Sequence, residues 1–426
     1  MSMPRQHFIK CPCCWKRFHL SQTKWIAEHH ELKDDYFIDD EGDKIEQKRF
    51  HPERFTTDCR AIDDKNMPCQ RDFACPHCHM EMPDRYFDCE PMYVTLVGTK
   101  GSGKTFFLTA LHHRLQQNPF EEDYELEGVS YIAGLYASKN IDLETNVKRL
   151  FRSTAPVDTF VTLDGTTVGN HAKKVSFPNA DSDRESYVAL PFTHVLESEG
   201  KKHALCLYDC QGTLFTKRGG IEEADSIFMQ AILNSDVLFF LYDPTQNENC
   251  VMEYTEKYGR HIYRDGKINV KELLGMEKAI LNPESDIDEQ SHLVFGAMAN
   301  YIRNFAQDRL DQNDRYARHI CIIVTKCDAW EKCLRETQGH LRELPKDDVI
   351  VAVSKEVENW IKRHDPAFTT AVRSFASHYT YIPVSAAGRQ VTKDAEGDEG
   401  YDIGVEPLNP RWVDVPFLCA LYPPNQ

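Results

Sequence analysis

A short segment close to residue 100 has the residue types and spacing of a loop that binds phosphate groups. Gly98-Thr99-Lys100-Gly101-Ser102-Gly103-Lys104-Thr105 reads as a glycine, four residues, and then glycine, lysine and threonine. Glycines let successive backbone amides turn inward around phosphates, and the positive end of a following helix attracts them. In such a loop Lys104 bridges the β- and γ-phosphates, and Thr105 holds Mg²⁺ through its hydroxyl. An apolar run at 92–98 and a helical pattern at 105–116 flank the segment, so we expect a nucleotide here.

Three shorter motifs follow, and each stands at the end of an apolar run that predicts a strand. They are Asp209-Cys210-Gln211-Gly212, Thr325-Lys326-Cys327-Asp328 and Ser385-Ala386-Ala387. In this order they resemble the motifs of the translation-factor-related GTPases, the class that includes Ras-like proteins. Ligands of open α/β sheets bind at the carboxyl ends of the strands, so the motifs and the phosphate loop should meet there.

The resemblance implies a role for each motif. Asp209 would reach Mg²⁺ through water, and the Gly212 amide would sense the γ-phosphate. Asp328 would accept hydrogen bonds from N1 and N2 of guanine, a donor pattern that adenine lacks. The Ala386 amide would contact guanine O6. These roles predict a protein that binds GTP and GDP with Mg²⁺, and the alternative is a P-loop ATPase.

The chain departs from this family pattern at several positions. Thr325 replaces an asparagine, which puts in doubt the contact that braces the loop rather than the choice of base, and Ala387 replaces a lysine. Thr213 stands where Ras-like proteins place the glutamine that orients the attacking water, and Gln211 precedes Gly212. Hydrolysis of GTP to GDP and phosphate should therefore be slow, or should use a residue from elsewhere in the chain or from a partner.

A switch threonine that closes on Mg²⁺ should lie between the phosphate-loop helix and the strand predicted from residue 187. Thr159 follows a helical stretch predicted at 141–152 and is our candidate. Thr162, Thr166 and Thr167 are rivals in the same stretch.

Two cysteine pairs near the N-terminus have metal-ligand spacing. Cys11 and Cys14 form one pair and Cys75 and Cys78 the other, each with a proline after its first cysteine. Four thiolates complete a tetrahedral zinc site, provided that the long interval between the pairs folds as an insertion. The other candidate ligands are Cys13, Cys59, Cys69, Cys89, His77 and His79. The alternative is a set of buried free thiols.

Composition limits the classes of partner. The net charge of −17 argues against a broad electrostatic grip on nucleic acid. Residues 1–27 are an exception, because they contain basic residues and no acidic ones, with Trp15, Phe18 and Trp25 among them. We find no apolar run of about 18 residues and no signal peptide, so we expect a cytoplasmic protein with reduced cysteines and no membrane contact.

The elements that carry these motifs predict an α/β fold, with a mostly parallel sheet covered by helices on both faces. Predicted strands lie at 92–98, 187–197, 203–208, 236–242, 320–325 and 379–384, and helices at 105–116, 221–233, 289–309 and 355–363. The strands at 187–197 and 203–208 should form a hairpin. A loop is expected at 393–404, and the C-terminal tail should pack back through Trp412, Phe417 and Leu418.

We predict two domains: a zinc-ribbon-like segment at 1–90 with an insertion, and a P-loop GTPase domain at 91–426 with insertions at about 126–184 and 244–318. This order resembles the double-GTPase group of bacterial conflict systems. That resemblance implies a regulatory GTPase in defence signalling, with a protein partner or effector. The rival hypothesis is a nucleic-acid-binding module that docks through the basic N-terminal face, with an accessory nucleotide site.

Overall fold

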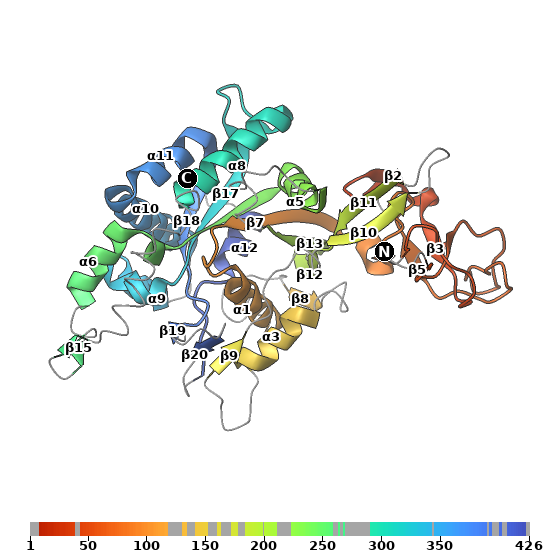
Figure 1. Cartoon of the computed structure of the whole chain (residues 1–426), viewed down its shortest axis with the longest axis horizontal. Coiled ribbons are helices and arrows are strands. Elements are labelled where there is room, and N and C mark those ends of the chain that lie inside the picture. The colour runs from red at the N-terminus through yellow and green to blue at the C-terminus, as the bar shows by residue number, and fades with distance from the viewer. Residues whose placement is uncertain are drawn as a thin grey trace.

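A computed structural model describes most of the chain. The described residues are 8–38, 43–117, 130–133, 141–151, 160–162, 172–177, 184–198, 200–210, 223–258, 263–264, 267–268, 290–342, 345–389, 392–393, 400–402 and 407–422. They form an α/β fold in which an N-terminal segment rich in short strands lies at one end of a larger sheet (Figure 1). Among the described residues, no helix is both long enough and apolar enough to cross a bilayer.

The central sheet has seven strands in the order β18-β17-β14-β7-β13-β12-β8. Their bounds are β7 Glu90–Gly98, β8 Ser130–Ala133, β12 Phe192–Ser198, β13 Lys201–Asp209, β14 Val237–Tyr242, β17 Tyr316–Val324 and β18 Ala376–Pro383. Five neighbours, from β18 to β13, run parallel, and β12 and β8 are added antiparallel. Every residue of β14 is buried, as expected for a strand covered on both faces. The predicted mostly parallel sheet is therefore confirmed.

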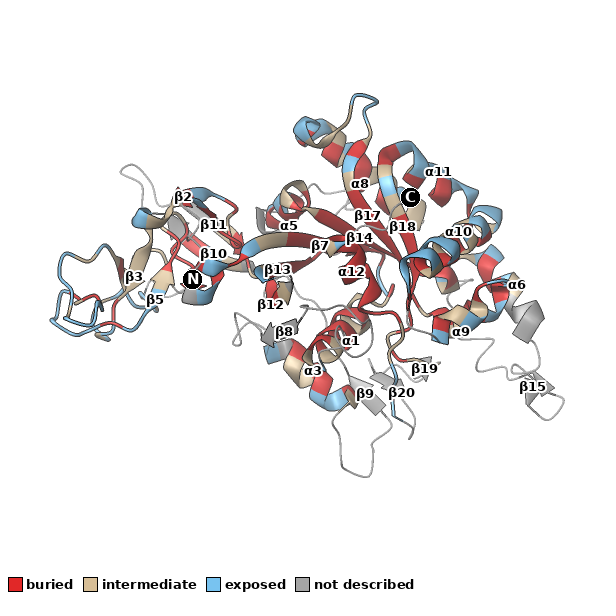
Figure 2. Cartoon of the chain, turned by 180° about the vertical axis from the view of Figure 1, so that it is seen from behind, coloured by how far each residue is buried: buried red, intermediate tan, exposed pale blue. Residues whose placement is uncertain are grey.

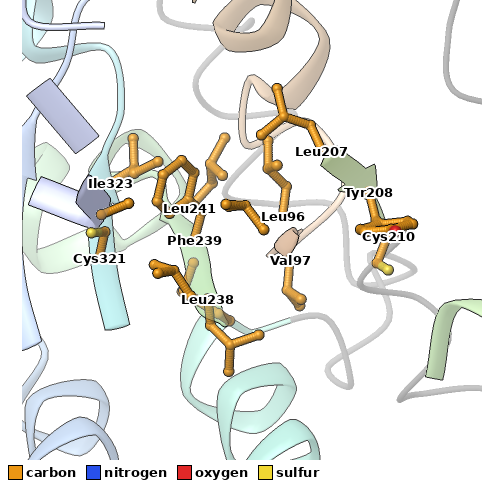
Figure 3. Packing of buried hydrophobic residues seen from close by; sticks show 14 of the residues in the cluster. Leu96, Val97, Leu207, Tyr208, Cys210, Leu238, Phe239, Leu241, Cys321 and Ile323 are labelled. Atoms are coloured by element: carbon orange, nitrogen blue, oxygen red, sulfur yellow. The ribbon is translucent and has the colours of Figure 1, made fainter. Parts of the chain in front are cut away.

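Alternating side chains of the central strand show that helices cover both faces. Phe239 contacts Phe107 of α1 (Lys104–Gln116), with ring centroids 6.4 Å apart. The next residue, Phe240, contacts Phe295 of α8 (Ser291–Phe305) at 5.1 Å on the opposite face. Figure 3 shows side chains of β7, β13, β14 and β17 packed together in this core.

Further helices belong to these two layers. Figure 1 shows α12 on the side of α1, and α5, α8 and α11 on the other side. The C-terminal tail packs back as predicted, because Trp412, Phe417 and Leu418 are buried. The other helices are α3 Ile141–Phe151, α5 Glu223–Asn234, α6 Glu248–Tyr258, α9 Cys327–Trp330, α10 Asp347–His364, α11 Pro366–Phe375 and α12 Val415–Leu421, with short 3-10 turns η4 Pro244–Gln246, η6 Gln307–Arg309, η7 Glu331–Cys333 and η8 Gln338–Arg342.

Some predicted elements have different limits in the structure. The strand predicted at 187–197 is interrupted at Leu190 and Pro191: β11 (Arg184–Ala189) pairs with β10 (Ala172–Phe177), and only β12 forms the predicted hairpin with β13. The helix predicted at 355–363 begins earlier, as α10, where acidic residues occupy its first turn. The loop predicted at 393–404 instead contains residues of two short strands, β19 (Thr392–Lys393) and β20 (Gly400–Asp402).

The stretch at 244–318 is not only an insertion. Its helix α8 packs against the central sheet and against α11 through Phe295 and Phe368, so it belongs to the layer that covers the sheet. The same stretch also contains a short antiparallel pair, β15 (Tyr263–Arg264) with β16 (Lys267–Ile268). Another short pair, outside this stretch, joins β9 (Phe160–Thr162) to β20. The predicted boundary at residue 90 falls on the first residue of β7.

The N-terminal segment is built from short antiparallel strands. They are β1 Phe8–Lys10, β2 Arg17–His19, β3 Lys24–Ile26, β4 Arg49–Phe50, β5 Asp72–Ala74 and β6 Glu81–Pro83, with 3-10 turns η1 Leu20–Gln22 and η2 Asp84–Asp88. Its buried residues are continuous with the core of the central sheet. Figure 2 shows buried ribbon in this segment and along most of β7, whose first three residues are exposed or intermediate.

Three tyrosine hydroxyls hold the end of β1 and the turn after it: Tyr86 from η2, and Tyr93 and Tyr208 from the strands β7 and β13 of the central sheet. Tyr86 and Tyr93 each donate to the carbonyl of Lys10 at 2.9 Å. Tyr208, the penultimate residue of β13, donates to the carbonyl of Pro12 at 2.6 Å. Its ring lies 5.5 Å from the ring of Trp15, and burial raises the pKa of its hydroxyl, so it stays a donor. The first cysteine turn is thus fixed to the strand that ends at Asp209.

We predict that Tyr208→Phe lowers the free energy of unfolding by about 1–3 kcal/mol, because the buried Pro12 carbonyl loses its donor. Urea unfolding of the full chain measures this change. Tyr301→Phe is the control: this half-buried tyrosine packs on Phe305, and its loss should cost less than about 0.5 kcal/mol. Equal stability of Tyr208→Phe and the parent would contradict the role given to this hydrogen bond.

Candidate functional site

The loop predicted to bind phosphate, residues 98–105 and called the phosphate loop below, runs from the end of β7 into α1, as the sequence predicts. Strand β7 ends at Gly98 and α1 begins at Lys104, directly after Gly103, whose φ of 91° suits glycine. The Lys104 ammonium donates to the carbonyls of Gly98 and Thr99 at 2.8 and 3.0 Å. The lysine side chain is therefore folded back over the loop, with its charge at the loop's centre.

One buried polar group of this loop and one beside it have no hydrogen-bond partner among the described residues. The group in the loop is the hydroxyl of Ser102, and the group beside it is the carboxylate of Asp209, of which neither oxygen has a partner. Ser102 is 0% exposed and Asp209 is 2% exposed. Asp209 ends β13 opposite Leu96 of β7, and the next amide, of Cys210, donates to the Leu96 carbonyl at 2.9 Å. A buried carboxylate without donors is costly unless a cation or donor meets it. Asp209 is therefore a buried carboxylate whose oxygens accept no hydrogen bond from the described residues.

The motifs expected to recognise the base meet at the same edge of the sheet. The hydroxyl of Ser385 donates to the carboxylate of Asp328, and the amide of Gly388 donates to the same hydroxyl at 2.8 Å. The amide of Cys327 donates to the Val384 carbonyl at 3.1 Å. Burial raises the pKa of Asp328, and the hydrogen bond from Ser385 works against that rise. Asp328 is therefore held in a fixed position with one oxygen engaged.

The C-terminal segment fixes the turn that follows Ser385. Ser385 and Arg411 exchange both backbone hydrogen bonds, at 3.1 and 2.8 Å. Gly388 has a φ of 75°, and a Cβ there would lie 1.9 Å from the Asn409 carbonyl oxygen. Only glycine fits at this position.

Lys326 has a partner that the sequence did not indicate. Its ammonium lies 2.5 Å from a carboxylate oxygen of Asp243, which is 1% exposed and follows β14 directly. The hydroxyl of Thr245 lies 3.3 Å from the same ammonium. An aspartate before a proline at the end of a buried strand is the signal that could have found this residue.

Predicted site residues differ in how far the structure describes them. It brings Gly98, Gly101, Ser102, Gly103, Lys104, Thr105, Asp209, Thr325, Lys326, Asp328, Ser385, Ala386 and Ala387 to one edge of the sheet. Gly212, Thr159, Gln211, Thr213, Thr166 and Thr167 lie outside the described residues. Thr162 ends β9 and pairs with Gly400. The switch threonine and the hydrolytic residue stay predictions.

The two cysteine pairs come together in the N-terminal segment. Cys11 and Cys14 lie in the turn between β1 and β2, and Cys75 and Cys78 in the turn between β5 and β6. Sulfur atoms of Cys11 and Cys78 are 3.7 Å apart, those of Cys14 and Cys75 are 3.8 Å apart, and all four lie within 4.8 Å of one another. The amides of Cys13 and His77 point at the sulfurs of Cys11 and Cys75. Four sulfurs in this arrangement, three of them on buried cysteines and one on the partly exposed Cys14, suit a tetrahedral cation.

The other candidate ligands lie outside this cluster. Among the described residues, these four cysteines are the metal-capable group that the structure assembles. Cys13 is buried in the same turn as Cys11 but is not one of the four, Cys69 and Cys89 are buried elsewhere, Cys59 is exposed, and His77 packs against Phe18. His79 contacts the buried Asp34 at 2.8 Å, and Arg49 donates to the His79 carbonyl. These contacts support the second cysteine turn.

The aromatic residues of the basic N-terminal face are mostly inside the protein. Trp15 and Phe18 are 8% and 2% exposed, and Trp25 packs on Phe73 at 4.8 Å. Lys24 lies 2.5 Å from the ring nitrogen of His79. Trp15 and Phe18 are therefore not available to stack on bases, which weakens the rival hypothesis of a nucleic-acid-binding module.

Comparison with known proteins yields structural likeness only. No protein-family model and no curated protein matches the chain. Among solved structures, sup35 complexed with GDP aligns at 10% identity and a TM-score of 0.24, covering 71% of this chain and 39% of that one. The Ski7 GTPase-like domain of S. cerevisiae, bound to GTP, aligns at 13% identity and a TM-score of 0.24, covering 79% and 51%. The chain thus spans about half or less of the length of these proteins. The nucleotides named for them are bound by those proteins.

Proposed function

We propose that the chain binds GTP and GDP with Mg²⁺ and acts as a nucleotide-dependent switch. The observation that carries the proposal is the buried carboxylate of Asp209, which lacks a partner among the described residues beside a phosphate loop. Two more motifs meet at the same sheet edge, where α/β sheets bind their ligands.

The phosphate end of the site fits a nucleotide with its cation. Lys104 now donates to two loop carbonyls, and phosphate oxygens are stronger acceptors for its charge. Thr105 is the second residue of α1, where its hydroxyl would hold Mg²⁺ together with Asp209. The positive end of α1 adds its own attraction for phosphate.

The base end of the site favours guanine. Asp328 accepts from Ser385, and its remaining acceptor capacity matches two neighbouring donors such as N1 and N2 of guanine. Adenine presents one donor and one acceptor instead, so the carboxylate would repel its ring nitrogen. A preference for ATP would return the chain to the wider class of P-loop ATPases.

The switch itself rests on segments outside the described residues. Gly212 and Thr159 would order around the γ-phosphate and Mg²⁺, as switch loops do in nucleotide-driven transitions. Hydrolysis is proposed to be slow or partner-assisted, because Thr213 replaces the water-orienting glutamine. A protein partner and a role in bacterial defence, which the double-GTPase resemblance implies, stay predictions.

We further propose that Cys11, Cys14, Cys75 and Cys78 hold one structural Zn²⁺. Burial raises the pKa of Cys11 and Cys78, so four thiolates close together require a cation to stay ionised. With four protein ligands the site has no open position, which favours a structural role over a catalytic one.

Lys104→Ala is predicted to abolish nucleotide binding while the fold is retained, since the lysine meets phosphate charge and contributes no core packing. Calorimetric titration with GTP and Mg²⁺ checks this, beside circular dichroism. Lys362→Ala, an exposed lysine of α10, is the matched control and should bind like the parent. Binding of GTP by Lys104→Ala at the parent's affinity would show that the phosphate-loop assignment is wrong.

Asp328→Asn is predicted to lower GTP affinity by at least about tenfold, because an amide donor would face the guanine donors. Affinity for xanthosine triphosphate, which presents an acceptor at that position, should rise. Competition titrations with both nucleotides measure the switch in preference. Asp348→Asn, an exposed aspartate in the first turn of α10, is the control. An unchanged GTP affinity in Asp328→Asn would reject the guanine assignment.

The double variant Cys75→Ser/Cys78→Ser should lose the zinc, which we expect at about one ion per chain, and should become less soluble, because structural zinc contributes to folding. Metal analysis of the purified protein and its soluble yield are the measurements. Cys59→Ser, at an exposed cysteine, should retain the metal. Full zinc content in the double variant would rule out this ligand set.

A further inference from the structure

One side chain outside the predicted motifs forms two hydrogen bonds to the phosphate loop. Gln246, the last residue of η4, donates through Nε2 to the Lys100 carbonyl at 2.8 Å and accepts through Oε1 from the Thr99 hydroxyl at 2.7 Å. A Cβ added at Gly101 would lie 3.2 Å from the same Nε2, so the amide rests directly against the loop. Both polar atoms of the Gln246 side chain therefore form hydrogen bonds with the loop, one with Thr99 and one with Lys100.

The turn that carries Gln246 also contacts the motif at residues 325–328, which is predicted to recognise the base. Asp243 begins this turn, and its carboxylate accepts from the amide and hydroxyl of Thr245 at 2.9 and 2.7 Å. The same carboxylate pairs with Lys326 at 2.5 Å. Residues 243–246 therefore connect the phosphate loop on one side with the motif of Asp328 on the other.

Within the described part of the chain, this connection occurs where the side chain of Thr325 forms no hydrogen bond to the phosphate loop. Thr325 replaces the asparagine that would brace the loop in the resembling GTPases, and its hydroxyl reaches only back to the Tyr242 carbonyl, at 3.4 Å. Thr325 does lie beside the loop, since a Cβ at Gly103 would be 3.9 Å from the threonine Cβ. That approach is between carbon atoms, so it provides no hydrogen bond that could orient the backbone of the loop.

We infer that Gln246 is a positioning residue that sets the shape of the phosphate loop in place of the missing asparagine. The inference rests on the proposed function, because the loop's task is to present its amides to a nucleotide. A loop held in its binding conformation loses less entropy when a ligand binds, so the effect should appear as affinity for phosphates and not as base selectivity.

The experiment uses the full chain with the variants Gln246→Ala and Thr99→Val. Each should weaken GDP binding by about fivefold to tenfold, mainly through faster dissociation, as expected for one or two lost hydrogen bonds. The ratio of GDP to IDP affinity should stay unchanged, because IDP differs only at the group that Asp328 would recognise. The two variants share one interaction, so the double variant should lose less than the product of the two.

A second readout needs no nucleotide. Amide hydrogen exchange in residues 99–104 of the ligand-free protein should speed up by at least about threefold in Gln246→Ala, because the loop opens more often. The matched control is Gln312→Ala, an exposed glutamine at the opposite end of the sheet, which should change neither readout. Gln246 is itself exposed, so its loss leaves the core intact.

The outcomes separate this inference from the proposed function. A parent that binds no guanine nucleotide would overturn the proposed function, while faster exchange in Gln246→Ala would still support the brace. Unchanged exchange in Gln246→Ala would overturn the inference whatever the nucleotide result. An altered ratio of GDP to IDP affinity would also overturn it, since Gln246 would then act on the base.

Discussion

The site depends on the parallel register of β13, β7, β14 and β17. In this register Asp209 lies opposite Leu96, Leu241 opposite Gly98, and Val324 opposite Tyr242. Because the carboxyl ends of parallel strands lie at one edge of the sheet, the loops that follow these strands lie close together. The chemistry of the edge then follows from what each loop carries: bare amides after β7, a carboxylate at the end of β13, and paired charges after β14 and β17.

Strand β13 links this edge to the N-terminal segment. Successive side chains of a strand point to opposite faces, so Tyr208 and Asp209 face different sides of the sheet. The first gives its hydroxyl to the Pro12 carbonyl, inside a cysteine turn, and the second ends beside the phosphate loop. A metal bound by Cys11 and Cys14 would therefore stiffen the support of Asp209 without touching the nucleotide. On this view the N-terminal segment is a structural part of the nucleotide site.

Sequence patterns predicted the parts of the fold that depend on local composition. Continuous apolar runs located β7, β14, β17 and β18, and cysteine spacing located both turns of the four-cysteine cluster, because each signal is contained in a few residues. The break at Pro191 was missed, since β11 before it pairs with β10 and bonds to the backbone of Cys13, while β12 after it pairs with β13. Asp243 and Gln246 were missed for a related reason: their role exists only once two loops, distant in sequence, are neighbours.

Negative charge gathers at the carboxyl edge of the central sheet. The chain carries a net charge of −17, and three carboxylates, of Asp209, Asp243 and Asp328, stand at the edge where a nucleotide would bring more negative charge. Lys326 neutralises Asp243, and the neutral hydroxyl of Ser385 donates a hydrogen bond to Asp328, so each of these two carboxylates has a partner. Asp209 has no such partner among the described residues, and phosphate alone would be repelled by it. On the proposed function, the nucleotide therefore enters this edge as its Mg²⁺ complex, because the cation meets Asp209 and the phosphates together.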